Sequence, residues 1–200
     1  MEITWHGKTC FRFKGDRVAV VTNPDKDAGK LKADVVLSSL PKGDLVEVED
    51  ARVFDWPGEY EVKDVPIIGF RAWTKSKSKE EEEGGEGEPT VIYYFEVDGV
   101  KICHLGFLGH VLTSDIVKKI GDVDVLLVSV GEDSNLPAKK AMEVIEAIEP
   151  RIVIPMGTKN PGSFMKDLGA DKFEEEEKYV VKGRSSLPDE NRIFVVLKHT

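Results

Sequence analysis

Short apolar runs separated by Gly, Pro, Asp and Lys make up most of the first half of the chain. Runs of this length, bounded by turn-forming residues, are typical of β-strands. The pattern predicts strands over residues 10–13, 18–22, 34–38, 51–54, 66–73 and 91–97. The dipeptide Asp98-Gly99 follows the last run, and because both residues tolerate positive φ it predicts a tight hairpin.

The second half alternates helical and strand-like patterns. Thr113 or Ser114 can cap a short helix over residues 115–120, which ends at Gly121. Residues 123–130 are almost continuously apolar, which is typical of a strand buried on both faces.

A longer helix is predicted from Pro137 to Pro150, and residues 151–156 form the next buried strand. The apolar face expected for this helix is made of Ala138, Met142, Ile145 and Ile148. Strand, helix and strand joined by short links form a βαβ unit. Following a mostly antiparallel half, this unit predicts a mixed sheet with helices outside it.

Residues 75–89 differ from the rest because they hold three Lys, six Glu and three Gly without a large apolar side chain. Such a segment cannot offset its ordering entropy by burial, so we expect a mobile, solvated acidic loop between two strands. A tail that binds a cation or a partner is the alternative interpretation. The acidic run at 174–177 is expected to be a solvated face.

Composition excludes several classes of protein. The 200 residues include 28 Lys plus Arg and 37 Asp plus Glu, a formal charge of −9, which lacks the basic surface that nucleic acids and anionic membranes require. No apolar stretch reaches the length of a membrane span, and the first residues do not resemble a signal peptide, so we expect a cytoplasmic protein. Cys10 and Cys103 lie in strand-like runs and are expected to be buried and unpaired.

Seven stretches of the chain, in the same order, resemble the metallo-β-lactamase superfamily, and within it the small UlaG-like zinc-dependent hydrolases. These stretches are residues 3–15, 20–24, 33–39, 55–69, 102–113, 121–131 and 150–159. The segment DWPGEYEV resembles the family's GPGEYEV hairpin, and HLGFLGH resembles its HLGDLGH motif. The resemblance implies one domain over residues 1–200 of the α/β (α+β) class, a four-layer αββα sandwich of two mixed β-sheets.

The family holds one or two metals through clustered imidazoles and carboxylates, which bind zinc and lower the pKa of a bound water. In this chain the positions that match the seven family ligands are Ser39, Pro41, Gly43, Asp44, Thr74, Phe107 and Gly157. Only Asp44 among them carries a group that binds zinc. Lys8 and Asn23 replace a neighbouring His and Asp, and the positive charge of Lys8 disfavours a cation further. We therefore expect a vestigial pocket without catalytic residues, metal ligands or a cofactor.

Two further residues of this pocket have expected structural roles. His104 has no second ligand at a metal-binding spacing, so a core histidine hydrogen-bonded to a backbone or carboxylate group is favoured. Phe107 is expected to fill the volume that metals and water occupy in relatives.

The favoured function is a non-catalytic binding or interaction protein that recognises a small molecule or a protein. A homo-oligomer is a further expectation, because relatives are often oligomers. The alternative is an active hydrolase of a small ester or phosphodiester that holds zinc through Asp44, His104 and other groups. Nucleic-acid processing, which other branches of the superfamily perform, is disfavoured by the charge of −9.

Overall fold

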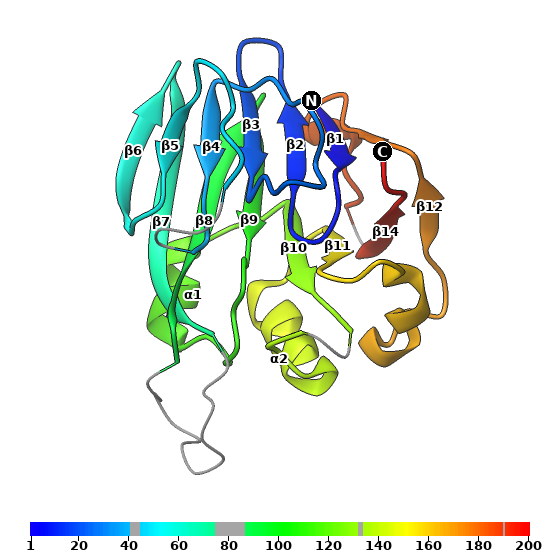
Figure 1. Cartoon of the computed structure of the whole chain (residues 1–200). Helices are drawn as coiled ribbons and strands as arrows, with labels where there is room; N and C mark the ends of the chain where they lie inside the picture. Colours follow the sequence, from blue (N-terminus) through cyan, green and yellow to red (C-terminus); the bar gives the residue numbers. More distant parts are fainter. Residues whose placement is uncertain (41–44, 75–86, 132–133, 190) are drawn as a thin grey trace.

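The computed structural model describes residues 1–40, 45–74, 87–131, 134–189 and 191–200, whose strands form two β-sheets (Figure 1). In spatial order, the six-stranded sheet contains β13 (Tyr179–Val180), β1 (Glu2–Trp5), β2 (Phe11–Lys14), β3 (Ala19–Thr22), β4 (Val35–Leu37) and β5 (Arg52–Phe54). The eight-stranded sheet contains β12 (Glu174–Glu176), β14 (Ile193–Leu197), β11 (Ile152–Met156), β10 (Val125–Ser129), β9 (Val100–His104), β8 (Pro89–Val97), β7 (Val65–Trp73) and β6 (Gly58–Val62).

Both sheets are mixed, as the predicted fold class requires. In the six-stranded sheet β1, β2 and β3 pair antiparallel, whereas β3, β4 and β5 pair parallel. In the other sheet β6 to β9 are antiparallel and β9, β10, β11 and β14 are parallel. The helices α1 (Ser114–Ile120) and α2 (Ala138–Ile148) connect β9 to β10 and β10 to β11, which confirms the predicted βαβ unit.

The main core lies between the two sheets and is rich in aromatic residues, with Phe11, Phe13, Tyr93 and Phe95 fully buried in it. A second core forms where the eight-stranded sheet meets α1 and α2. All five residues of β10 are buried, because this strand is covered by the other sheet on one face and by helices on the other. The two described α-helices therefore lie on the same sheet (Figure 1).

Loop segments cover the outer side of the six-stranded sheet, and the described residues form no helix there. Cys10 and Val21 pack there against Ala28, with Leu31 and Ala33 beside them. The connection between β3 and β4 thus shields the centre of the outer face.

Local signals in the sequence account for the ends of several elements. The hairpin between β8 and β9 turns at Asp98 (φ +51°) and Gly99 (φ +77°), as predicted. The Oγ1 of Thr113 accepts a hydrogen bond from Ile116 N, and α1 ends at Gly121 with φ +69°. The predicted cap, helix and stop are therefore confirmed.

The expected apolar face of α2 is wrong at its first position. The buried residues are Ala141, Val144, Ile145 and Ile148, while Ala138 is exposed and Met142 is only half-buried. The observed set follows the i, i+3, i+4, i+7 pattern and includes one more β-branched side chain. It is therefore the face that α2 turns toward the sheet.

Three short 3₁₀ turns complete the described elements: η1 (Pro161–Phe164), η2 (Lys166–Leu168) and η3 (Arg184–Ser186). The acidic run expected at the surface is exposed and forms the edge strand β12. Residues 75–86 of the acidic loop predicted over 75–89 lie outside the described residues. The helices of the described part are too short and too polar to span a bilayer. Cys10 and Cys103 are buried free thiols, and burial raises the pKa of each to about 12.

Candidate functional site

A cavity of about 200 Å³ opens at the loops that follow β1, β3, β4 and β9. Its lining residues are Lys8, Thr9, Asn23, Pro24, Asp25, Ser38, Leu40, Leu45 and Phe107. Three of the predicted positions, Lys8, Asn23 and Phe107, line it directly.

Asn23 connects three loops at the base of this cavity. Its Nδ2 donates to Thr9 Oγ1 and to Ser39 Oγ, each at 3.2 Å, and its Oδ1 accepts from Ser39 N at 2.6 Å. Thr9, Asn23 and Ser39 are all buried. The Ser39 carbonyl in turn accepts hydrogen bonds from Val91 N and Thr90 Oγ1, both at 2.8 Å. Both N–H donors and the oxygen acceptor of the Asn23 side chain are therefore hydrogen-bonded to other protein groups.

His104 lies beneath the same loops and is completely buried. Its Nδ1 accepts a hydrogen bond from Gly106 N at 3.2 Å, so the proton is on Nε2, which donates to the Thr9 carbonyl at 3.1 Å. Burial lowers the pKa of His104 to about 4, so the ring is neutral at physiological pH. Both ring nitrogens are thus engaged with the backbone.

Lys8 is at the rim rather than in the centre of the site. Its Nζ lies 2.8 Å from Asp25 Oδ2 and 3.6 Å from Asp27 Oδ2, and the hydrogen bond to Asp25 raises the pKa of Lys8. The Lys8 carbonyl accepts from Trp5 Nε1 at 3.0 Å and from Gly157 N at 2.9 Å. The charge is therefore balanced locally, and the backbone of Lys8 anchors the loop that carries Gly157.

Two glycines of the site cannot easily be exchanged for larger residues. Gly106 has φ +58°, and a Cβ on it would lie 2.5 Å from Ser39 Oγ. Gly157 has φ +89°, a region that L side chains rarely adopt, and a Cβ on it would lie 3.4 Å from Ser129 Oγ. A histidine at position 157 would therefore require a change in backbone conformation.

The remaining predicted positions are distributed differently. Phe107 is half-buried and forms a wall of the cavity, so it does not fill the space as expected. Thr74 donates its backbone N–H to the Glu88 carbonyl at 2.9 Å and does not line the cavity. The predicted positions Pro41, Gly43 and Asp44 lie outside the described residues.

Sequence reasoning missed Thr9 and Ser129. Thr9 Oγ1 accepts a hydrogen bond from Asn23 Nδ2. The Thr9 carbonyl accepts hydrogen bonds from His104 Nε2 and, at 3.0 Å, from Thr22 Oγ1. Ser129 Oγ donates to the Gly106 carbonyl at 3.0 Å. A polar residue at the carboxyl end of a buried parallel strand was the available signal for Ser129, because ligands bind at such ends.

The described residues around this cavity do not supply a set of ligands for a divalent metal. The part of the chain that the structure describes contains no group of three or more His, Cys, Asp or Glu side chains that could hold an ion. The carboxylate of Asp25 pairs with Lys8, and both nitrogens of His104 are hydrogen-bonded. Around this cavity the described side chains are already satisfied by one another.

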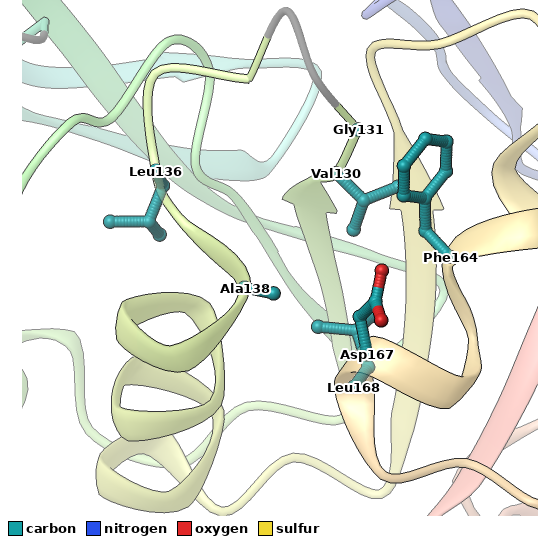
Figure 2. Close-up of a pocket in the computed structure, with 7 residues that line it drawn as sticks. All are labelled: Val130, Gly131, Leu136, Ala138, Phe164, Asp167 and Leu168. Atoms are coloured by element: carbon teal, nitrogen blue, oxygen red, sulfur yellow. The ribbon is translucent and has the colours of Figure 1, made fainter.

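A second hollow, of about 160 Å³, lies at the carboxyl end of β10 beside the start of α2. Figure 2 shows the Asp167 carboxylate close to Phe164 and Leu168, opposite Val130 and Ala138. Asp167 is the one titratable side chain among the described lining residues, which are otherwise apolar or glycine. Among its described lining residues, the hollow therefore has no second titratable side chain that could act with Asp167 in acid–base catalysis.

Comparison with known proteins agrees with the fold. Residues 2–157 match the family model of the β-lactamase superfamily domain. A Thermotoga maritima structure, provisionally assigned as a Zn-dependent hydrolase of the metallo-β-lactamase superfamily, is 31% identical with a TM-score of 0.80, and 98% of each chain is covered. The chain belongs to the metallo-β-lactamase superfamily.

Relatives in archaea extend the similarity. A UPF0173 protein of Pyrococcus abyssi is 28% identical over 189 residues, covering 82% of this chain and 87% of the relative. A UPF0173 metal-dependent hydrolase of Thermococcus onnurineus is 30% identical over 100 residues, covering 50% and 43% of the two chains. The chain is thus similar to proteins that are named as metal-dependent hydrolases.

Proposed function

We propose that this chain is a non-catalytic member of the superfamily that binds a small molecule in the cavity beside Asn23 and Phe107. The cavity of about 200 Å³ has apolar walls from Pro24, Leu40 and Leu45 and a polar base. Apolar walls with a few polar groups are typical of small-molecule sites, and a volume below the roughly 300–1,000 Å³ of most ligand pockets restricts the ligand to a compact molecule.

The Asn23 hydrogen bonds are the observation that carries this proposal. In place of a carboxylate with free lone pairs, position 23 has an amide whose Oδ1 accepts from Ser39 N and whose Nδ2 donates to Thr9 and Ser39. Binding an ion there would break hydrogen bonds between buried groups, and each orphaned group would cost about 1–3 kcal/mol. The neutral His104 would also have to leave two backbone partners.

The names of the relatives support a second candidate, a metal-dependent hydrolase of a small ester or phosphodiester. This candidate needs zinc held by His104 together with Asp44, which lies outside the described residues. The lack of a nucleic-acid partner and assembly into a homo-oligomer remain predictions from sequence.

Metal content separates the two candidates. We expect protein purified without chelator to contain much less than one zinc, iron or manganese per chain, and a zinc titration to leave its thermal midpoint unchanged. The Thermotoga maritima relative, purified in the same way, is the matched control. A stoichiometric transition metal that survives dialysis would overturn the non-catalytic proposal.

A variant that narrows the cavity tests the binding part of the proposal. Small-molecule ligands found by thermal shift on the native chain should lose their effect in Leu45→Trp, because the larger side chain occupies the cavity. Val53→Trp, at an exposed position of β5, is the control substitution. Ligands that stabilise both variants as well as the native chain would show that the cavity is not the site.

The cytoplasmic location is also part of this proposal. Cys10 and Cys103 are unpaired and buried, as is common for proteins of a reducing compartment. Detection of the protein in an exported fraction would contradict it.

A further inference from the structure

A slot of about 160 Å³ lies outside the cavity described above, between the β5–β6 turn and the strands β7 and β8. Its lining residues are Trp56, Pro57, Arg71, Trp73, Pro89, Thr90 and Val91. It shares no lining residue with the cavity beside Asn23. The slot and the cavity beside Asn23 are therefore two separate candidate binding sites.

The backbone fixes the walls of this slot. A Cβ at Gly69 would lie 3.1 Å from the Trp56 carbonyl and 3.2 Å from Pro57 Cα, so glycine lets the turn rest on β7. Tyr60 Oη donates to the Trp56 carbonyl at 2.9 Å and holds the turn in place.

The opposite wall comes from alternate residues of β7. Arg71 pairs with Val91 and Trp73 pairs with Pro89 in the β7–β8 ladder. Because successive strand residues point to opposite faces, Arg71 and Trp73 present their side chains on the same face. An aromatic ring and a guanidinium are thus held next to each other by a regular strand.

The guanidinium of the slot has no acidic partner among the described residues. Arg71 is exposed, and no carboxylate of the described residues lies within the 4.0 Å of an ion pair. Trp56 is 55% exposed, and it is the largest of the exposed apolar side chains in the described residues. A ligand for this slot should therefore supply acceptors and a flat apolar surface.

We propose that the slot binds a small aromatic carboxylate, with its ring between the two indoles and its carboxylate on Arg71. The size agrees, because an apolar cavity of about 150 Å³ takes up benzene. The guanidinium of an arginine matches a carboxylate in a bidentate geometry, and aromatic rings stack on indole.

Titration with 4-nitrobenzoate tests this proposal on the full chain, because a nitroaromatic ring in the slot quenches the fluorescence of Trp56 and Trp73. We expect saturable quenching for 4-nitrobenzoate. For its neutral analogue 4-nitrobenzyl alcohol we expect binding at least about tenfold weaker, since the charge-assisted hydrogen bonds are lost. Acetate, which has no ring, should not compete.

Variants of the slot give the second measurement. Arg71→Gln should weaken 4-nitrobenzoate binding about tenfold or more and remove the preference over the alcohol, whereas Trp56→Leu should weaken both ring compounds. Arg52→Gln, which changes an exposed arginine of β5 outside the slot, is the matched control and should leave the dissociation constant unchanged. Absence of saturable binding, or equal affinity in native chain and Arg71→Gln, would overturn the proposal. Because this site shares no residue with the cavity beside Asn23, either proposal can fail without the other.

Discussion

Asn23 Oδ1 accepts a hydrogen bond from the backbone N–H of Ser39 at 2.6 Å, and this contact joins the loops after β3 and β4. The same side chain donates to Ser39 Oγ and Thr9 Oγ1. Asn23 has φ +42°, a left-handed conformation in which asparagine is more common than other residues with a side chain. One residue thus supplies both the turn and the connection between loops.

Asn23→Ala should destabilise the fold by about 2–4 kcal/mol, because it leaves the buried Ser39 N–H unpaired and puts alanine at positive φ. Urea unfolding measures the difference. Asn23→Gly, which loses the same hydrogen bonds without the steric cost, should be less destabilised by about 1 kcal/mol. A loss below about 0.5 kcal/mol in Asn23→Ala would show that the network contributes little.

Gly106→Ala should be more destabilising than a change of backbone preference alone explains. A Cβ at this position would lie 2.5 Å from Ser39 Oγ and 2.6 Å from Ser39 Cβ. We expect a loss of about 3 kcal/mol or more, measured by thermal or urea unfolding. Gly99→Ala is the control, because Gly99 has φ +77° with nothing within 4 Å of the added carbon, and it should cost about 1 kcal/mol.

His104 should make the stability depend on pH. Burial lowers its pKa from 6.5 to about 4, so between these values the unfolded chain binds a proton that the folded chain does not. The free energy of unfolding therefore falls as the pH is lowered through this window. The loss from this residue amounts to about 3 kcal/mol, and it is complete near pH 4.

A comparison of native chain and His104→Gln isolates this effect, because the carboxylates are common to both proteins. Glutamine does not titrate, so the difference in free energy of unfolding between them should shrink on acidification. At neutral pH the variant should be less stable, since the hydrogen bonds to Thr9 and Gly106 change. Parallel pH profiles for the two proteins would show that His104 is not buried and neutral.

Asp124 should support the other end of β10. Its side chain is 1% exposed, with Arg184 Nε at 3.4 Å and Arg151 Nε at 3.6 Å, and it accepts from Lys101 N at 2.9 Å. Asp124→Asn leaves two guanidinium groups without their buried counter-charge and should cost about 2 kcal/mol or more. Chemical denaturation measures this loss. Asp122→Asn, at a 77% exposed position nearby, should change the stability by less than about 0.5 kcal/mol.

The order and type of most elements as far as β11 could be predicted from sequence because each depends on neighbours along the chain, whereas the strand β14 was not predicted. The hairpin at Asp98-Gly99, the cap at Thr113 and the apolar run of β10 are local patterns. The family resemblance also predicted that Asn23 and His104 belong to one site. The loss of most zinc-binding groups there remains a prediction from the residue types.

Only the tertiary structure decided how these residues satisfy one another. His104 bonds to Thr9 across 95 positions of sequence, and Asn23 bonds to Ser39 across 16. Likewise, the face of α2 that is buried depends on the sheet that the helix covers. Phe107 lines the cavity and does not fill it. The sequence determined which groups are present, because composition and local preference are properties of the chain. The packing of two sheets determined which groups meet, because hydrogen bonds and burial depend on distances that no local pattern specifies.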